Sequence, residues 1–229
     1  MSGKVLLPKI QDYPINNVYA KDMKRIIILL LIVVSGQYAA VSLDNPGNLK
    51  TALLIVDIQG FYFPGEGPGL VNAVPASLRA KEVLQVFREK KQLVVHVRHQ
   101  AAKGFEIHEN VSPVAGEKVI TKEKVNAFQG TDLLEFLKEN GVTRLIVMGM
   151  QTHMCLEAAV RAASDFGFEC IVVEDACATR DLVLGDRIVK AEDVHAATLV
   201  TIRDGRYGKV IHSGDFMQNI DTWLFGKPE

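Results

Sequence analysis

Three residues of different chemistry stand where short apolar runs of the sequence end. Asp57 and Lys122 each follow directly after such a run, and Cys155 comes a few positions after a third. A carboxylate base, an ammonium and a thiol are groups that can together carry out nucleophilic acyl transfer. Each residue also has an ordinary interpretation, with Cys155 as a core residue, Asp57 as a cap or loop carboxylate and Lys122 as a solvated lysine. Their joint placement favours the functional interpretation.

The expected surroundings of the three residues suit this chemistry. Asp57 follows a buried run, so a partly apolar environment should raise its carboxyl pKa and make it a competent base. Lys122 can hold Asp57 in place and compensate its charge. Cys155 is expected to open a helix, where unpaired backbone N–H groups and the helix dipole favour the thiolate. The same N–H groups can bind the oxyanion of a tetrahedral intermediate.

Strands and helices must alternate to bring these positions together. The apolar runs are continuous, which is typical of strands buried on both faces of a parallel sheet. Between them lie segments whose apolar residues recur at helical spacing. The predicted strands are 51–56, 92–98, 118–121, 145–148, 168–173 and 199–202, and the predicted helices are 72–90, 132–141, 156–166 and 191–197. This order predicts an α/β fold: a doubly wound, mostly parallel, Rossmann-like sheet in three αβα layers, with helices on both faces. In such folds ligands bind at the carboxyl ends of the strands.

The amino-terminal part of the sequence has a different character. A basic start, Met23-Lys24-Arg25, precedes nine apolar residues at 26–34, and small residues follow. This pattern is typical of a secretory signal peptide, and the apolar run is short for a membrane span. We therefore interpret residues 1–42 as an extension that carries a signal peptide at 23–42, and residues 43–229 as one domain of moderate size. An uncleaved anchor is the alternative.

Composition limits the classes of partner. The 229 residues carry a formal net charge of −1 and no basic block, which does not favour nucleic-acid binding. After signal cleavage the protein is expected to be periplasmic or secreted, without stable membrane association; without export it would be cytoplasmic. A homo-oligomer is expected, because such folds often bury a sheet edge or a helix face between copies.

The chain has three cysteines. Cys170 lies in an apolar strand pattern and is interpreted as a small core residue. Cys177 follows that strand, and its sequence context assigns it no role. No CxxC pair and no zinc-ligand spacing occurs. A redox protein that uses Cys155 with Cys170 or Cys177 as the resolving thiol is one alternative function, and a binding protein without turnover is another.

Three segments of the sequence resemble the motifs of a known family. The resemblance is to the isochorismatase-like cysteine hydrolases, and it extends over about residues 50–215. The three segments are Leu54-Ile-Val-Asp57-Ile-Gln59, Lys122-Glu-Lys-Val-Asn-Ala-Phe128 and Gly149-Met-Gln-Thr152-His-Met-Cys155.

The resemblance implies a catalytic role for each of the three residues. Asp57 would be the base, Lys122 its partner and Cys155 the nucleophile. Lys124 is a nearby candidate for the lysine, but the family's lysine stands six positions before the phenylalanine of an Ala-Phe pair, which here is Phe128.

The same resemblance implies an unusual backbone before the cysteine. The family carries a cis peptide in this segment, which falls here between Met150 and Gln151. The N–H groups of Gln151 and Cys155 would then form the oxyanion hole. Gln151, Thr152 and Cys155 would be polar because this strand-to-helix junction is the active site.

The cysteine also indicates a branch of the family. Members that cleave a vinyl ether need no cysteine nucleophile, so Cys155 favours cleavage of a C–N bond in a small carboxamide, ureido acid or lactam through a thioester. The related nicotinamidases bind a metal through an Asp-x-His and a further histidine. His96, His99 and His108 lack that pattern, so no metal and no cofactor is expected.

Residues near the catalytic positions in the sequence could form the substrate pocket. His153 is interpreted as a structural or substrate-side residue, and His195 as packed or capping. The phenylalanines have core packing as an equal alternative. The predicted pocket residues are Gln59, Phe61, Phe63, Phe128 and Thr152.

Overall fold

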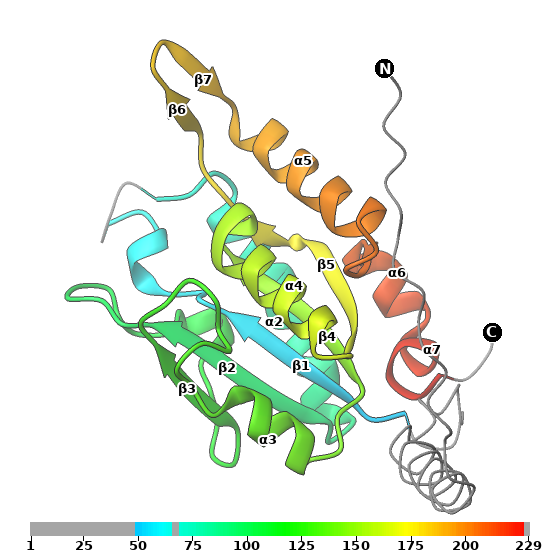
Figure 1. Ribbon diagram of the computed structural model, residues 1–229. Coiled ribbons are helices and arrows are strands. Elements are labelled where there is room, and N and C mark those ends of the chain that lie inside the picture. Colours follow the sequence, from blue (N-terminus) through cyan, green and yellow to red (C-terminus); the bar gives the residue numbers. More distant parts are fainter. Residues whose placement is uncertain (1–48, 66–68, 227–229) are drawn as a thin grey trace, which may run out of the picture. The chain divides into compact units, whose positions relative to one another are not determined.

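The computed structural model describes residues 49–65 and 69–226, and its centre is a parallel sheet (Figure 1). The six strands run in the order β3-β2-β1-β4-β5-β8, and every neighbouring pair is parallel. The signal peptide predicted at 23–42 lies outside the described residues. The strands are β1 (Thr51–Val56), β2 (Leu93–His99), β3 (Lys118–Lys122), β4 (Arg144–Met150), β5 (Glu169–Ala178) and β8 (Lys209–Ile211).

Helices cover both faces of the sheet, so the predicted three-layer α/β fold is confirmed. In Figure 1, α3 and α4 lie over the front face, while α2 crosses behind the sheet and packs against β5 and α6. The helices are α2 (Ala73–Glu89), α3 (Leu133–Glu139), α4 (Glu157–Asp165), α5 (Ala191–Asp204), α6 (Ser213–Gln218) and α7 (Ile220–Phe225); shorter turns are η2 (Gly60–Tyr62), η3 (Glu109–Val111) and the π-helical η4 (Thr152–Leu156).

The sheet has one point at which the order of its strands reverses. From β1 the chain winds outward through β2 to β3, and it then returns to β4 on the other side of β1 and winds outward again. All six residues of β1 are buried, as expected for the central strand of a doubly wound sheet. Ligand sites of such folds lie in the crevice beyond the carboxyl ends of the two strands at the reversal. The reversal therefore places the site beyond β1 and β4.

One predicted strand is wrong. Residues 199–202, which were expected to form the last strand, continue helix α5, and the last strand is β8. Leu199 and Ile202 are buried on the same side of α5 as Val194, whereas Val200 is exposed. A run of four apolar residues does not distinguish a strand from a buried helix segment, and here the helical spacing from Val194 was the stronger signal.

A small hairpin projects between β5 and α5. Its strands β6 (Leu182–Leu184) and β7 (Arg187–Val189) pair only with each other, and Figure 1 shows the hairpin extending beyond the sheet. Two of its apolar side chains, Leu184 and Ile188, are 79% and 61% exposed.

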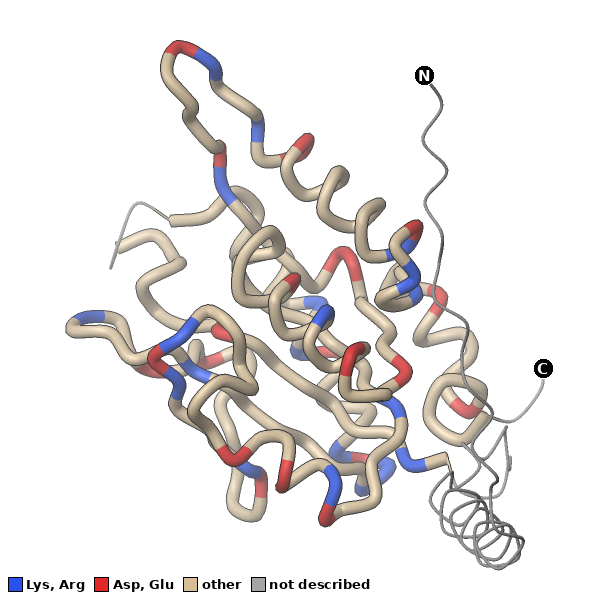
Figure 2. Tube along the Cα trace, viewed as in Figure 1, with Lys and Arg blue, Asp and Glu red and all other residues tan. Residues whose placement is uncertain are grey.

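Acidic and basic residues are interspersed over the described chain, and the basic residues form no continuous stripe (Figure 2). Among the described residues, no helix is long and apolar enough to cross a membrane.

Candidate functional site

Asp57 lies at the carboxyl end of β1 in a backbone conformation that few residues adopt. Its φ of 52° is in the left-handed region, and its N–H donates to the Val97 carbonyl at 2.9 Å. Aspartate tolerates this region better than most residues, and such conformations concentrate at functional sites. Beside it, Gly149 of β4 has a φ of 139°, and a Cβ there would lie 1.9 Å from the Val56 carbonyl oxygen. Only glycine lets the two strands approach closely next to Asp57.

Lys122 reaches the same point from β3. Its Nζ lies 2.8 Å from Asp57 Oδ2 and 3.2 Å from Cys155 Sγ. The side chains of Asp57 and Lys122 are both 0% exposed, so each compensates the buried charge of the other. Lys124, the other candidate lysine, is exposed and contributes only its carbonyl oxygen, 3.1 Å from Lys122 Nζ. The geometry therefore selects Lys122.

Cys155 follows β4 on the π-helical turn η4. The peptide bond between Met150 and Gln151 is cis, and the turn continues directly into α4. The thiol side chain is buried, with 5% of the residue exposed. Single π-helical turns within helices are rare and occur frequently at functional sites. The turn places the thiol of Cys155 next to the ammonium of Lys122.

Burial dominates the electrostatics of the site. It raises the pKa of Asp57, and Lys122 offsets part of that rise. Burial and the charge of Asp57 raise the pKa of the Cys155 thiol to about 12, although Lys122 acts in the opposite direction. Burial therefore opposes the thiolate that the position at a helix start predicted. A thiol whose pKa is raised in this way needs a base before it can react as a nucleophile, and the carboxylate of Asp57 belongs to the same buried cluster.

The carboxylate of Asp57 keeps its capacity to accept a proton. It forms an ion pair with Lys122, and the Cys155 thiol donates toward it, while neither of its oxygens has a further hydrogen-bond partner among the described residues. A buried carboxylate with open acceptor positions beside a protonated thiol can take the proton when the thiol reacts. The pair therefore has the geometry of a base and a nucleophile.

His99 is a fourth group at the same point. Its Nδ1 lies 2.9 Å from Lys122 Nζ, and single atoms of Asp57, His99 and Cys155 lie within 4.8 Å of one another. A carboxylate, an imidazole and a thiol could ligate a metal such as zinc, but the ammonium of Lys122 lies among them. The histidine pattern in the sequence gave no sign of this contact, which depends on the register of β2 and β3.

The structure gives Gln59 a role within the protein framework. Its Nε2 donates to the carbonyls of His99 and Phe105 at 3.0 and 2.7 Å, and its Oε1 accepts from the His99 N–H at 2.6 Å. Gln59 is fully buried. Both polar atoms of its side-chain amide form hydrogen bonds with the end of β2 and the loop that follows, so neither is left without a partner within the protein.

The three predicted pocket phenylalanines lie in different surroundings. Phe61 is half-buried on η2, with its ring centroid 4.2 Å from that of Tyr62. Phe63 is buried and stacks on His108. Phe128 packs in the core against Phe166 and Phe168, beyond the end of α4. Phe61 thus packs against Tyr62, and Phe128 takes the core position that was its alternative.

Tyr62 is a residue of the site that the sequence did not single out. Its hydroxyl lies beside the side-chain amide of Gln151, and burial followed by the nearby charges of Cys155 and Asp57 raises its pKa. The phenol therefore stays protonated and can donate a hydrogen bond next to the thiol. Gln151 Oε1 is buried without a hydrogen-bond partner among the described residues. The sequence did not reveal Tyr62 because η2 and the segment after β4 come together only when the chain folds.

Two histidines anchor the turn that carries Cys155. Thr152 is fully buried, and its hydroxyl lies 3.0 Å from His195 Nδ1 on α5. His153 Nδ1 lies 2.6 Å from the Thr179 hydroxyl, just after β5. Thr152 thus positions η4 from within, and His195 connects that turn to α5.

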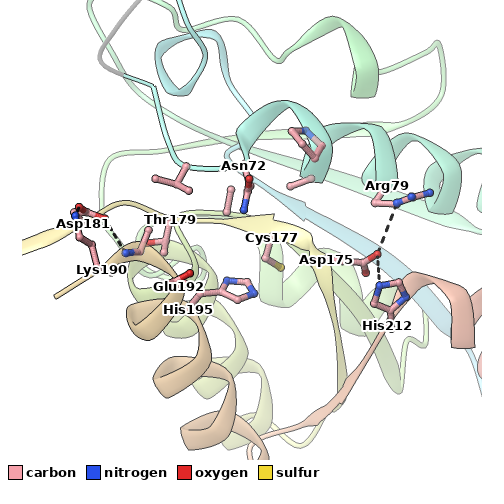
Figure 3. A pocket seen from close by; sticks show the side chains of 15 residues that line it. Asn72, Arg79, Asp175, Cys177, Thr179, Asp181, Lys190, Glu192, His195 and His212 are labelled. Atoms are coloured by element: carbon pink, nitrogen blue, oxygen red, sulfur yellow. Dashed lines mark hydrogen bonds and ion pairs between the residues drawn. The ribbon is translucent and has the colours of Figure 1, made fainter.

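A cleft of about 640 Å³ opens on the outer side of these anchors, between α2 and α5. Figure 3 shows His195 and Thr179 in its wall, with Asp175 between Arg79 and His212 at the other end. His212 Nε2 lies 3.2 Å from Asp175 Oδ2. None of Asp57, Lys122 and Cys155 lines this cleft, so it is separate from the site, although His195 and Thr179 connect its wall to the turn that carries Cys155.

Comparison with known proteins identifies relatives of the whole domain. The family model of the Isochorismatase domain matches residues 51–213. The uncharacterised isochorismatase family protein YddQ of Bacillus subtilis is 41% identical over 181 residues, which are 74% of this chain and 100% of that protein. Maleamate amidohydrolase of Pseudomonas putida is 32% identical over 199 residues, 75% of this chain and 87% of that enzyme. The crystal structure of an isochorismatase hydrolase from Oleispira antarctica has a TM-score of 0.70 and 34% identity, and covers 79% of this chain and 100% of that chain.

The matched range contains every member of the site. Asp57, Lys122 and Cys155 all lie within the family-model match, and the fold of the solved relative extends over the same domain. The resemblance seen in the three sequence motifs is thereby confirmed: the chain belongs to the isochorismatase family.

Proposed function

We propose that the protein is an amidase that cleaves the C–N bond of a small carboxamide or related amide through a thioester on Cys155. The observation that carries the proposal is the buried cluster in which the Lys122 ammonium lies 2.8 Å from the Asp57 carboxylate and 3.2 Å from the Cys155 thiol. The similarity to maleamate amidohydrolase supports an amide as the substrate class.

The first half of the reaction forms the acyl-enzyme. Asp57 takes the thiol proton as the sulfur of Cys155 attacks the amide carbonyl, and the electron pair of the C=O bond moves to oxygen. Because burial and the charge of Asp57 raise the pKa of the thiol, we expect its deprotonation to be coupled to attack. Collapse of the tetrahedral intermediate breaks the C–N bond, and the proton on Asp57 passes to the leaving nitrogen. Ammonia or an amine departs, and a thioester remains.

The second half regenerates the thiol. Asp57 takes a proton from a water molecule, whose oxygen attacks the thioester carbonyl. The C–S bond breaks, the proton returns to the sulfur, and the carboxylic acid leaves. Lys122 stabilises the alternating negative charge on Asp57 and Cys155.

Donors near the thiol fit the developing oxyanion. We assign this role to the backbone N–H groups of Gln151 and Cys155, and Tyr62 offers an additional O–H donor from η2. Thr152 contributes by anchoring the turn rather than by contacting the substrate, since its hydroxyl is engaged with His195. Phe61 remains a candidate for the pocket wall, next to Tyr62.

The test is a panel of small amides with ammonia release as the readout. Maleamate, neutral carboxamides, ureido acids and lactams are compared on the wild-type chain, on Cys155→Ser and on Asp57→Asn. We expect turnover of at least one class and a loss of at least about a thousandfold in kcat for either variant. Mass spectrometry of a quenched reaction should find the acyl group on the peptide that contains Cys155.

Two results would count against the proposal. One is turnover that persists in Cys155→Ser, and the other is a Cys155 thiol that reacts with an alkylating agent no differently in wild type and in Asp57→Asn. Cys170 and Cys177 serve as internal controls, because both thiols are buried and lie close to backbone carbonyls. Their alkylation should not depend on Asp57.

We also propose that the protein assembles as a homo-oligomer through its β6–β7 hairpin. An isolated two-stranded hairpin is marginally stable in water, and this one exposes Leu184 and Ile188. A second copy of the chain would cover these side chains. Light scattering should find a multiple of the monomer mass for wild type and the monomer for Leu184→Glu combined with Ile188→Glu. Val114→Glu, at an exposed site elsewhere, is the control; equal masses for all three proteins would exclude this interface.

Export is proposed from the sequence pattern at 23–42. The measurement is the mass of the mature amino terminus after expression of the full chain in a bacterial host with separated periplasm. A terminus near residue 43 in that fraction is the expected result. A protein that starts at Met1 or Met23 and remains in the cytoplasm would contradict it.

A further inference from the structure

The ammonium of Lys122 is surrounded by more acceptors than it has protons. Its Nζ lies 2.8 Å from Asp57 Oδ2, 2.9 Å from His99 Nδ1, 3.1 Å from the Lys124 carbonyl and 3.2 Å from Cys155 Sγ. An ammonium has three N–H donors and no acceptor. Four acceptors around one buried cation are a coordination shell, which is more than the three-residue catalytic cluster requires.

His99 completes this shell. Because the ammonium can only donate, Nδ1 of His99 must be the acceptor, which places the ring proton on Nε2. Burial, followed by the charge of Lys122, lowers the pKa of His99, in agreement with a neutral ring. A neutral imidazole with a free Nδ1 lone pair is also a metal ligand.

The sheet places His99 beside the side chain of Lys122, which extends from β3 across β2 toward Asp57 at the end of β1. The strand β2 lies between β3 and β1, and His99 pairs directly with Lys122 in the parallel register. Gln59 binds both the N–H and the carbonyl of His99. The lysine side chain therefore crosses β2 beside a ring whose backbone is fixed on both sides.

The carboxylate within the shell has unused binding capacity. Asp57 is 0% exposed, and apart from Lys122 and the Cys155 thiol neither of its oxygens has a hydrogen-bond partner among the described residues. The contact with Lys122 is the main compensation of its charge in this shell, and the Cys155 thiol and His99 contribute less. A buried carboxylate of this kind requires a cation.

We propose that Asp57, His99 and Cys155 form a cation site whose resident cation is the Lys122 ammonium, and that a thiophilic divalent metal can take its place when the ammonium is removed. His99 is then a positioning residue that keeps the ammonium between the base and the nucleophile. The assignment of those two roles rests on the proposed function, whereas the cation site itself does not.

The chemistry of the ligands selects the class of metal. One carboxylate, one imidazole and one thiolate suit Zn²⁺ or Co²⁺, with the Lys124 carbonyl or water as the fourth ligand. Metal bonds of about 2.0–2.3 Å require these atoms to move inward by roughly 0.8 Å from their distances to Nζ. Cys155 must release its proton to solvent when it binds the metal.

The test uses Co²⁺, because thiolate ligation produces a charge-transfer absorption that surface histidines do not give. Lys122→Met replaces the ammonium by an uncharged side chain of similar length. We expect Lys122→Met to bind one Co²⁺ with this absorption and to resist thermal unfolding better with metal than without it. Wild type should show neither effect at the same concentration.

Further variants assign the ligands. In the Lys122→Met background, His99→Leu should weaken Co²⁺ binding by at least about tenfold, and Cys155→Ser should abolish the charge-transfer absorption. His212→Asn is the matched control, because His212 is exposed and its Nδ1 caps α6, which asparagine also does well. It should bind Co²⁺ as Lys122→Met does.

Each result decides the proposal. If Lys122→Met folds and binds no more Co²⁺ than wild type, or if it fails to fold even with Co²⁺ or Zn²⁺ present, the cation site is disproved. If wild type proves to hydrolyse no amide, the proposed function fails while the Co²⁺ assay still judges the site.

Where wild type is active, His99 has a second readout. His99→Leu should lower kcat by about tenfold at nearly unchanged KM, because His99 acts on Lys122 and not on the substrate. His99→Asn should recover most of kcat, since its Oδ1 can accept in place of Nδ1. A change in KM alone would assign His99 to substrate binding instead and overturn its positioning role.

Discussion

At the scale of single residues, Gly149 occupies a position beside β1 that has no room for a side chain. A Cβ on Gly149 would lie 1.9 Å from the Val56 carbonyl oxygen, and it would have to displace the backbone of β1 just before Asp57. Gly149→Ala should therefore lower the free energy of unfolding by more than about 3 kcal/mol, because backbone atoms cannot move aside as side chains do. Chemical denaturation measures the change.

A second glycine separates steric exclusion from backbone strain. Gly130 also has a positive φ, 73°, but a Cβ there meets nothing within 4 Å. Gly130→Ala should cost about 1 kcal/mol, the ordinary penalty for a left-handed alanine. Equal losses for the two variants would mean that the contact with Val56 is not what requires Gly149.

Gln59 illustrates what a sequence motif leaves open. Its position two residues after Asp57 suggested a contact with substrate, but its amide makes three hydrogen bonds to the backbone at His99 and Phe105. Gln59→Leu should lower the free energy of unfolding by about 3 kcal/mol, because buried backbone groups lose their partners. Gln85→Leu on the exposed side of α2 should change it by less than about 0.5 kcal/mol. If Gln59→Leu keeps wild-type stability and only raises KM, the substrate interpretation is correct.

At the scale of elements, the turn η4 depends on its tie to α5. Thr152→Val removes the hydroxyl that meets His195 Nδ1, and the half-buried imidazole loses its partner. We expect a loss of about 1–2 kcal/mol in unfolding free energy and a decrease in kcat of about tenfold, because η4 carries Cys155. Thr152→Ser should retain activity, since it keeps the hydroxyl.

A threonine within α5 provides the control for this tie. Thr198 is also buried, but its hydroxyl donates to the Val194 carbonyl of the same helix. Thr198→Val should lower stability without changing kcat. Equal losses of kcat in the two valine variants would show that α5 acts on activity through general destabilisation and not through η4.

The elements also explain how far the sequence could lead. Continuous apolar runs predicted β1 and β4, and the residues after them marked the strand ends that carry Asp57 and Cys155. The run at 199–202 was ambiguous, because four residues do not define a period, and it belongs to α5. Tyr62 was missed because its neighbours Gln151 and Cys155 are about ninety residues away in the chain. Helix position predicted a Cys155 thiolate because it was weighed without the burial that only the fold creates.

At the scale of the whole molecule, one carboxylate joins three segments that are distant in the sequence. Glu117 forms an ion pair with Arg88 of α2 at 2.8 Å, its Oε2 lies 2.8 Å from His96 Nε2 of β2, and it accepts from the Val114 N–H at 2.9 Å. Its side chain is only 10% exposed. Burial by itself would raise the pKa of Glu117, but the hydrogen bonds from Arg88, Val114 and His96 lower it from 4.5 to about 2.

This shift makes the stability of the fold depend on pH in a defined window. The folded pKa lies below the unfolded value, so the stabilisation is complete above pH 4.5 and is lost as the pH falls through about 2. A shift of this size corresponds to about 3 kcal/mol. The difference in unfolding free energy between wild type and Glu117→Gln should therefore be large at pH 7 and shrink steadily below pH 4.5. Glu82→Gln, which breaks an exposed pair with Arg79, should cost less than about 1 kcal/mol. A difference between wild type and Glu117→Gln that stayed constant from pH 7 to pH 3 would mean that Glu117 stabilises the fold by its shape and not by its charge.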